Sequence, residues 1–398
     1  MKILQSAPLD IQISPKLKYA GTERILLYLN QELDKMGHES LVCAPANSDL
    51  GGFGKIIPTR KNHLWKESEN NRKVVRSPKA YENHYKKCLD FSLENKVDVL
   101  HDHPGQYLLD SKEYFKRKDK LNIPIVTTIH SIAVHEHDER HAKFRQLQKE
   151  GYPIHFIGIS KSHIKNFERN AGIKFDGFVY NGVPLDLFPF QKKKKDYMLW
   201  LGRLSKIKGT DIAVEAAKRT GKPLIIAGEV HNPYRKEYEE KVKPYLTKIV
   251  KSEKERVSLI EKLAKGETIA NEGDILFIGP VDDYQKSILY KNAYVTLQPN
   301  RWKEPFGLVP VESMATGTPT IVTNRGALPE LVKDGKTGYI IESGGENPDA
   351  ELITKGVINS LEKIRYLNPE DSRKNVYERF SAKQMTLNYI KFYEEFGK

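Results

Sequence analysis

The chain has 398 residues, of which 39% are hydrophobic and 29% are charged, and its net charge is +13. This length is too great for one ordinary core and predicts two domains of about 150–200 residues each. The chain has only two cysteines, Cys43 and Cys88, so a disulfide framework is not needed and a reducing cytoplasm is the default expectation. No apolar run reaches about 18 residues, and the apolar start breaks at Gln5. We therefore expect a cytoplasmic protein without a signal peptide or a membrane-spanning helix.

The positive charge is partly local. Residues 55–87 hold ten Lys or Arg side chains and three Glu side chains, and residues 192–195 are a second basic run. Such an excess favours polyanions, which include nucleic acid, phosphorylated ligands and anionic lipid. A solvated face and a linker explain the same runs equally well.

Short runs rich in Ile, Val and Leu alternate with amphipathic stretches. In the first half they predict strands at residues 2–5, 39–43, 97–101, 125–129 and 155–159. In the second half the expected strands are residues 197–201, 223–227, 275–278, 293–298, 319–322 and 338–341. Between them lie helical patterns such as residues 22–36, which end at Gly37. The alternation predicts an α/β protein with parallel sheets.

The strand and helix pattern runs twice, with a break at residues 181–195. We therefore expect two Rossmann-like, doubly wound domains, residues 1–185 and residues 186–380. Ligands in such domains bind beyond the carboxyl ends of the strands, so the expected site is a cleft between the domains. The charged residues 241–272 are expected to form a helical insertion.

The stretch from residue 302 to residue 332 carries the strongest chemical signal. Glu304 and Glu312 stand eight residues apart around a turn at Phe306 and Gly307, and a helix is expected to begin near Pro310. Glu312 could then accept two hydrogen bonds from a ribose diol, as acids do in other doubly wound nucleotide sites. The backbone N–H groups expected to point at a phosphate or a sugar oxygen belong to Gly307, Leu308 and Val309.

This stretch closely resembles the donor-site signature of the family-4 retaining glycosyltransferases. The resemblance covers nearly the whole chain, most strongly from residue 181 onward. It implies the two-domain GT-B fold, in which a last helix, here residues 381–398, completes the first domain. It also implies transfer of a sugar from a nucleotide sugar with retention of configuration, with Glu304 at the sugar hydroxyls.

A second motif, LWLGRLSKIKG, places two cations after a predicted strand that ends at Gly202. Arg203 offers a forked contact and Lys208 a point charge, which together suit a diphosphate. Two solvated cations in a basic protein are the alternative. The family resemblance implies that this Gly-Arg pair and the following Lys-Gly pair hold the donor diphosphate.

The motif YAGTER follows the first predicted strand and opens a helix. A glycine there lets the backbone approach a phosphate. The motif resembles the first Gly-rich loop of the family, which usually has two glycines. Here Ala20 stands at the first position, so only Gly21 carries over.

Three histidines end strands in the first half of the chain. His130, in TTIHS, stands at the mouth of the predicted sheet, and a histidine packed at a strand end is the alternative. The resemblance implies that His130 lies beside the donor sugar. His101 and His103 end the preceding strand and resemble a family motif near the acceptor cleft.

His135, His137 and His141 alternate with acidic residues at a spacing that could bind zinc. A solvated loop or a lining of the acceptor pocket fits this segment better.

The motif FIGPVDDYQK corresponds to the turn on which the family places the nucleobase, here at Val281 and Asp282. An aspartate at 282 or 283 could accept from guanine, which would favour a GDP-sugar. Both aspartates could instead cap the next helix.

No Asp-x-Asp motif occurs, so we expect catalysis without a metal and without a cofactor other than the nucleotide-sugar co-substrate. Arg203, Lys208 and helix N-termini can neutralise the leaving group instead. The expected function is therefore that of a retaining hexosyltransferase using a UDP- or GDP-sugar. Its expected catalytic residues are His130, Arg203, Lys208 and Glu304.

The acceptor is open. The basic segment 55–87 favours a phosphorylated or lipid-linked acceptor, or contact with the anionic inner face of a membrane. Two alternatives stand beside a transferase: a nucleotide-sugar epimerase of the same fold, and a non-catalytic binder of nucleic acid or anionic membrane. Nucleic acid is not the expected partner, because the lysines are scattered and no nucleic-acid module is present.

Overall fold

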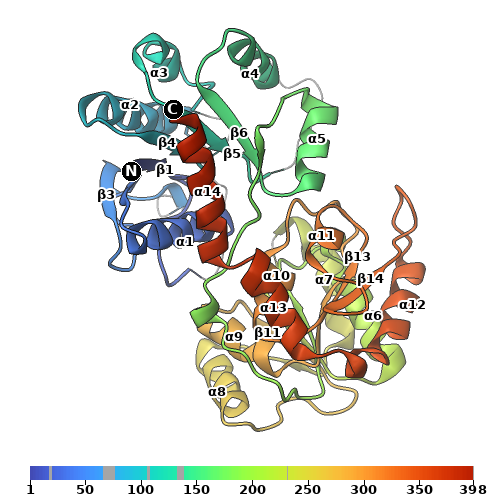
Figure 1. The fold of residues 1–398 in the computed structure, drawn as a ribbon. Coiled ribbons are helices and arrows are strands. Elements are labelled where there is room, and N and C mark those ends of the chain that lie inside the picture. The colour runs from blue at the N-terminus through green and yellow to red at the C-terminus, as the bar shows by residue number, and fades with distance from the viewer. Residues whose placement is uncertain (18–19, 66–76, 105–107, 132–138, 231, 398) are drawn as a thin grey trace. The chain divides into compact units, whose positions relative to one another are not determined.

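The computed structural model describes residues 1–17, 20–65, 77–104, 108–131, 139–230 and 232–397 (Figure 1). The chain forms two compact units. The first comprises Met1–Gly182 and Ala382–Lys398, and the second comprises Val183–Ser381. Each unit is built on a sheet of seven parallel strands flanked by helices. No helix in the described ranges is long and apolar enough to cross a membrane.

The first sheet has the strand order β3-β2-β1-β4-β5-β6-β7. Its strands are β1 (Lys2–Ser6), β2 (Glu39–Pro45), β3 (Lys55–Arg60), β4 (Val99–Asp102), β5 (Ile125–Thr128), β6 (Ile154–Gly158) and β7 (Gly177–Phe178). The chain runs outward from β1 to β3 and then resumes at β4 on the other side of β1. The order of the strands therefore reverses between β1 and β4, where doubly wound sheets leave a ligand crevice.

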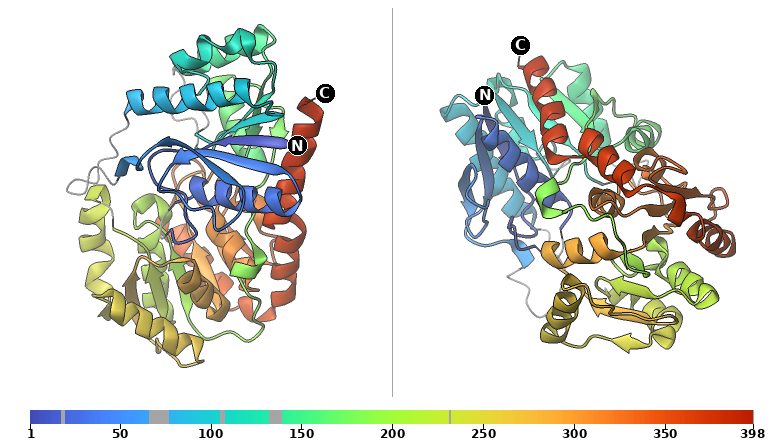
Figure 2. Two further views of the ribbon diagram at one scale, coloured as in Figure 1. Left: turned by 90° about the vertical axis from the view of Figure 1, so that its left-hand side faces the viewer. Right: turned by 60° about the horizontal axis from the view of Figure 1, so that its bottom comes forward.

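The helices of the first unit are α1 (Thr22–Lys35), α2 (Pro78–Glu94), α3 (Lys112–Phe115), α4 (Glu139–Lys149), α5 (Lys161–Ala171) and α14 (Ala382–Phe396). Helix α14, red in Figure 2, packs beside α1 although the two are far apart in sequence. Its Tyr389 and Tyr393 side chains are fully buried. The C-terminal helix therefore belongs to the core of the first unit.

The second sheet has the order β10-β11-β9-β8-β12-β13-β14. Its strands are β8 (Met198–Leu201), β9 (Leu224–Ala227), β10 (Lys248–Ile249), β11 (Ile275–Gly279), β12 (Val295–Gln298), β13 (Thr320–Thr323) and β14 (Gly338–Ile341). Here the reversal falls between β8 and β12, which pair in parallel with Leu297 opposite Trp200.

The helices of the second unit are α6 (Thr210–Thr220), α7 (Arg235–Lys241), α8 (Glu253–Ala264), α9 (Asp283–Asn292), α10 (Leu308–Ala315), α11 (Leu328–Leu331), α12 (Ala350–Leu361) and α13 (Pro369–Arg379). Helix α6 packs against α12, and α10 packs against α13. The core beneath them is apolar and includes the fully buried Trp200.

All eleven predicted strands are confirmed, with ends that differ by at most two residues. The α/β fold of two Rossmann-like sheets is confirmed as well. One expectation was wrong. Residues 241–272 are not a continuous helical insertion, because they contain the short strand β10 before α8. The helix expected to begin near Pro310 is confirmed as α10, which begins at Leu308 after the N-cap Gly307, with φ +111°, and has Pro310 in its first turn.

Candidate functional site

The predicted donor residues of the second unit follow the carboxyl ends of neighbouring strands. Arg203 and Lys208 come after β8, and Glu304 comes after β12. Because β8 and β12 are adjacent and parallel, these residues follow the strands at the same, carboxyl end of the sheet. This is the end at which the reversal of strand order leaves a crevice. The topology thus brings Glu304 to the same end of the sheet as Lys208, from which it is 96 positions away in the chain.

Glu304 is held by three donors that converge on one carboxylate oxygen. Its Oε2 accepts from Lys208 Nζ at 2.5 Å, Asn300 Nδ2 at 2.7 Å and Trp302 Nε1 at 2.8 Å. The residue is only 8% exposed. No donor in the described ranges reaches its other oxygen, Oε1. The carboxylate is therefore fixed in position with one oxygen left to accept a further hydrogen bond.

The backbone around Glu304 is equally constrained. Glu304 forms a β-bridge with Gly326, and its carbonyl accepts from the backbone N–H of Ala327 at 2.7 Å. A Cβ atom on Gly326 would lie 2.2 Å from the Glu304 carbonyl oxygen, so only glycine permits this approach. The predicted turn at Gly326 thus acts on the site by holding the backbone of Glu304.

The two cations differ in how far they are satisfied. Lys208 is paired with Glu304, and its Nζ lies 4.6 Å from the centre of the Trp302 ring. Arg203 packs its guanidinium 5.9 Å from the ring of Tyr234. Its buried Nε has no hydrogen-bond partner among the described residues. A buried donor without a partner is costly, and an anionic ligand would satisfy it.

The N-terminus of α10 follows Glu304 closely in the chain, because the helix begins at Leu308. Gly307 caps the helix without any side-chain hydrogen bond, so the N–H groups of Leu308 and Val309 in the first turn are not capped from Gly307. Phe306, which is buried and packs edge-on against Phe380 at 6.1 Å, anchors this turn in the core. Uncapped helix N-termini attract anions.

Glu312 is more deeply buried than the sequence suggested, with only 3% of its side chain exposed. Its Oε1 accepts from Lys286 Nζ at 2.7 Å and its Oε2 accepts from Tyr290 Oη at 3.0 Å. Lys286 also pairs with Asp283 at 2.8 Å. Since each carboxylate oxygen can accept two hydrogen bonds, a ribose contact would have to share Glu312 with these partners.

The turn before α9 contains the expected nucleobase residues. Val281 is buried. Asp282 is the N-cap of α9 and forms a capping box with Gln285, with hydrogen bonds of 2.8 and 3.2 Å. The capping alternative is therefore confirmed for Asp282. It is wrong for Asp283, which lies in the first turn and pairs with Lys286.

In the first unit, Gly21 is the N-cap of α1. Its φ of −87° is available to any residue, and a Cβ atom there would meet nothing within 4 Å. Arg24 braces the preceding segment by donating to the carbonyls of Ala20 at 2.9 Å and Leu17 at 2.6 Å. The fold itself does not require a glycine at position 21.

His130 follows β5 and is partly buried. Its Nε2 lies 3.4 Å from Nδ1 of His103, and the two rings are stacked 5.7 Å apart. Burial, together with the nearby His163, lowers the pKa of His130 to about 3. Burial likewise lowers the pKa of His101 to about 3 and that of His103 well below its ordinary value. These imidazoles are therefore neutral at physiological pH.

The remaining histidines do not form a described metal centre. His135 and His137 lie outside the described residues. His141 is buried and contacts the rings of Phe144 and Phe167. Within the described ranges, no group of three or more His, Cys, Asp or Glu side chains could hold a metal ion.

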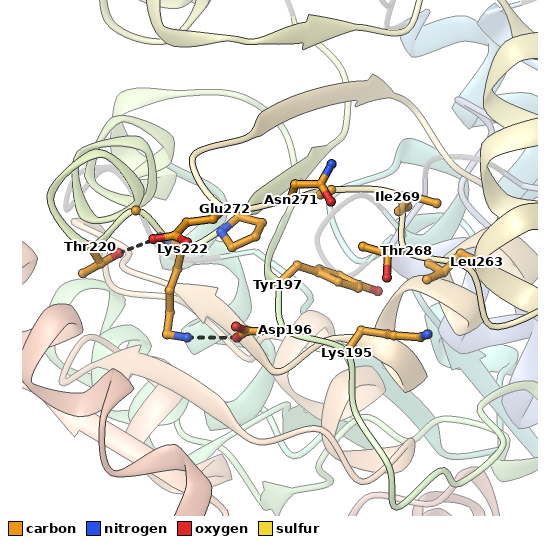
Figure 3. Close-up of a pocket in the computed structure, with 13 residues that line it drawn as sticks. Lys195, Asp196, Tyr197, Thr220, Lys222, Leu263, Thr268, Ile269, Asn271 and Glu272 are labelled. Atoms are coloured by element: carbon orange, nitrogen blue, oxygen red, sulfur yellow. Dashed lines mark hydrogen bonds and ion pairs between the residues drawn. The ribbon is translucent and has the colours of Figure 1, made fainter.

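A pocket of about 400 Å³ lies near the amino-terminal ends of the strands of the second sheet (Figure 3). Its lining segments, residues 195–197, 222–223 and 268–272, precede β8, β9 and β11. Its two lysines are already engaged, Lys222 with Asp196 at 2.9 Å and Lys195 with the carbonyl of Gly266. The pocket is therefore separate from the carboxyl-end residues described above.

The sequence missed four side chains that define the site. Asn300 and Trp302 donate to Glu304, and Lys286 and Tyr290 donate to Glu312. Asn300 and Trp302 could have been found, because they stand between a predicted strand end and Glu304. Lys286 and Tyr290 lie on one face of α9, and no local pattern connects them with Glu312.

Two protein-family models match the chain. The model for Glycosyl transferases group 1 matches residues 186–378, and the model for Glycosyltransferase Family 4 matches residues 19–187. The chain therefore belongs to the glycosyltransferases that these two models describe, and it has the GT-B fold.

Individual proteins with this fold and sequence pattern are known. Spore coat protein SA of Bacillus subtilis (strain 168) is 30% identical over 203 residues, which are 50% of this chain and 49% of that protein. The chain thus matches about half the length of this curated relative. Sucrose-phosphate synthase from Thermosynechococcus elongatus has a similar structure, with a TM-score of 0.69, 16% identity and coverage of 99% and 98% of the two chains. For HepE of Anabaena the TM-score is 0.66, the identity 17%, and the coverage 99% and 100%.

Proposed function

We propose that the protein transfers a hexose from a UDP- or GDP-sugar to an acceptor hydroxyl, with retention of the anomeric configuration. The observation that carries this proposal is the pair of cations after β8. The buried Nε of Arg203 has no hydrogen-bond partner in the part of the chain that the structure describes, and Lys208 is positioned by Glu304. Two such cations beside an uncapped helix N-terminus suit the diphosphate of a nucleotide sugar.

The cations act where charge develops. As the bond between the sugar C1 and the β-phosphate oxygen breaks, its electron pair stays on the diphosphate, and Arg203 and Lys208 stabilise that charge. The acceptor oxygen forms its bond to C1 on the same face. Its proton passes to the leaving phosphate, so that a nucleoside diphosphate and the glycosylated acceptor result. No metal is assigned a role in this route.

Three residues position the donor in this proposal. Glu304 accepts a sugar hydroxyl at its free Oε1, and His130 contacts the sugar from the first unit. Glu312 accepts from the ribose diol, sharing its oxygens with Lys286 and Tyr290. The N–H groups of Leu308 and Val309 complete the phosphate contacts.

Of the two nucleotides, UDP has the better support. One Asp282 oxygen is occupied by the capping hydrogen bond, which weakens the argument for guanine. The similar HepE structure is of a complex with UDP-glucose. The proposed acceptor is phosphorylated or lipid-linked, and the proposed location is the cytoplasm, with peripheral contact at the inner face of the membrane through the basic segment 55–87.

The test measures nucleotide release from UDP-glucose, GDP-mannose and ADP-glucose, each at a saturating concentration. We expect release from one of the first two. Arg203→Ala should lower kcat about 10²- to 10³-fold, as expected for the loss of one stabilising donor. The matched control is Arg219→Ala, whose exposed guanidinium pairs with Glu215 and Glu351 and which should keep the full rate.

Three outcomes would contradict the proposal. An Arg203→Ala variant with an unchanged rate removes the assigned role of that cation. Conversion of the donor to an epimer without an acceptor indicates an epimerase. Salt-dependent DNA or vesicle binding without any nucleotide-sugar binding indicates a non-catalytic protein.

A further inference from the structure

A continuous row of polar side chains runs through the first unit and ends at His130. It starts at the carbonyl oxygen of Phe53, which accepts from Asn30 Nδ2 at 3.0 Å. Asn30 Oδ1 then meets Ser40 Oγ at 2.7 Å, and Ser40 Oγ meets Gln5 Nε2 at 3.1 Å. The members from Asn30 to Gln5 are all buried.

The row continues through two imidazole rings. Gln5 Oε1 lies 3.1 Å from His103 Nε2, and His103 Nδ1 lies 3.4 Å from His130 Nε2. His103 is 1% exposed, so water cannot replace its partners. Every member of the row comes from the first unit.

The backbone carbonyl at the start gives the row a direction. A carbonyl oxygen can only accept, so the amide nitrogen of Asn30 faces Phe53 and the amide oxygen faces Ser40. The Ser40 hydroxyl must therefore donate to Asn30, which leaves its lone pairs to accept from the amide nitrogen of Gln5. The amide oxygen of Gln5 is thereby turned to His103.

The same reasoning applies to the imidazole rings of His103 and His130. An amide oxygen can only accept, so Nε2 of His103 carries the proton. In a neutral imidazole the other nitrogen is then a bare acceptor. His103 Nδ1 can consequently be satisfied only by a proton on Nε2 of His130.

We infer that this row fixes His130 as the tautomer with its proton on Nε2, so that Nδ1 is presented as a hydrogen-bond acceptor for a ligand hydroxyl. His103 is then a positioning residue for His130. None of the described residues hydrogen-bonds Nδ1 of His130. The inference rests on the proposed function in one respect, which is that His130 contacts the donor sugar.

The surroundings favour neutral rings. The ring of His101 packs on His103 with centroids 4.0 Å apart, and His101 itself is held by Tyr393 Oη at 2.7 Å and Thr128 Oγ1 at 2.8 Å. The depressed pKa of His130, about 3, agrees with a neutral ring.

The chemical consequence concerns selectivity. A neutral acceptor nitrogen binds the hydroxyl of a sugar and is repelled by a phosphate oxygen, which has no proton to donate. The first unit is thus suited to a sugar hydroxyl at His130, whereas the cations of the second unit are suited to phosphate.

The direct test uses the full-length chain labelled with ¹⁵N at histidine. Long-range ¹H–¹⁵N correlation at pH 7 reports which nitrogen of each ring carries the proton, and the His130 signals are assigned by their loss in His130→Asn. We expect a protonated Nε2 and a bare Nδ1. A proton on Nδ1, or on both nitrogens, overturns the inference, whatever the activity.

Variants of His103 test the positioning role. His103→Asn places an amide oxygen near the position of Nδ1 and should keep the His130 tautomer, whereas His103→Leu removes the acceptor and should abolish the preference for Nε2. The matched control is Thr59→Val, which removes the hydroxyl contacts to His84 at 2.7 Å and to the carbonyl of Ala44 at 3.3 Å, neither of which belongs to the row, and should leave the His130 signals unchanged. Equal His130 spectra in all four proteins would refute the role of His103.

Activity provides the second readout. With UDP-glucose as the donor, His103→Leu should lower kcat about tenfold, which corresponds to the loss of about one hydrogen bond. His103→Asn should keep most of the kcat of the unaltered protein. If the unaltered protein releases no nucleotide from any donor, the proposed function fails, and the NMR result still decides the inference. If His103→Asn and His103→Leu lose activity equally while the tautomer differs, His103 does not act through His130.

Discussion

In the first unit the candidate residue His130 lies beside a second neutral imidazole ring, whereas in the second unit the candidate residues Glu304 and Glu312 each pair with a lysine. Eleven of the 12 histidines lie between residues 38 and 163. His130 touches His103, which packs on His101. In the second unit, Glu304 pairs with Lys208 at 2.5 Å and Glu312 pairs with Lys286 at 2.7 Å.

The difference follows from what each unit is proposed to bind. A diphosphate needs fixed cations, and a buried lysine remains charged only when a carboxylate compensates its lost hydration. A sugar hydroxyl needs a neutral donor or acceptor in a defined orientation, which an imidazole held by hydrogen bonds supplies. The two units should therefore respond differently to pH and to the loss of a charge.

The largest expected effect is acid unfolding of the first unit. Burial lowers the pKa of His84, His101 and His130 from 6.5 to about 3 and that of His163 to about 4. Because the folded pKa lies below the unfolded value, the stability from these neutral rings is present above pH 6.5 and is lost as the pH falls toward 3–4. At pH 5 the loss is about 2 kcal/mol for each histidine.

Urea unfolding at pH 7 and pH 5, with pulse proteolysis and mass spectrometry to locate the cuts, checks this order. Fragments of the first unit should appear at lower urea at pH 5 than at pH 7. Cleavage of the second unit at a lower urea concentration than the first unit at pH 5 would contradict the comparison.

Next in size is the loss of a buried cation in the second unit. Lys286→Met removes the cation beside the buried carboxylates of Glu312 and Asp283 and should lower the free energy of unfolding by about 3–5 kcal/mol. The control is Lys236→Met, whose side chain is 87% exposed and pairs with Glu240 at 3.9 Å. That variant should change stability by less than about 0.5 kcal/mol. Equal midpoints in chemical denaturation would show that the buried pair is not a stabilising feature.

A smaller effect is expected on catalysis. In Glu304→Gln, Lys208 loses its counter-charge and the three donors meet a neutral amide, so kcat/KM on the active donor should fall about tenfold to a hundredfold. The control, Glu346→Gln, changes an exposed glutamate of the same unit. Steady-state nucleotide release measures both. An unchanged Glu304→Gln rate would mean that the charge of Glu304 is dispensable.

The smallest effect concerns Glu23, a buried acid of the first unit whose pKa shift makes stability fall as the pH rises, the opposite of the histidines. Burial raises the pKa of Glu23 from 4.5 to about 7. The stability provided by its protonated form is therefore full below pH 4.5 and is lost as the pH rises to 7. Glu23→Gln keeps the neutral form at every pH. Its advantage over the unaltered protein should be about 2 kcal/mol larger at pH 8 than at pH 5.5.

Urea unfolding of the first unit at both pH values measures this advantage, with the exposed Glu94→Gln as control. A Glu23→Gln advantage that does not depend on pH would show that Glu23 is ionised in the folded state.

The sequence by itself predicted most strands of both sheets and the end of the second sheet at which the candidate residues lie. Strands that are buried on both faces must be short continuous apolar runs, and this made β1 and β8 recognisable. The three strands missed, β3, β7 and β10, do not have this form. β3, at the edge of its sheet, carries Pro58 between Lys55 and Arg60, as edge strands do, and the other two have only two residues.

Only the tertiary structure decided which side chains meet. Lys208 and Glu304 are 96 residues apart, and Gln5 and His103 are 98 residues apart. A residue type shows what a side chain can donate or accept, but its partner depends on which strands become neighbours. For this reason the motif at Glu304 predicted a donor site from sequence, whereas the three donors on its oxygen and the direction of the hydrogen bonds to His130 required the folded chain.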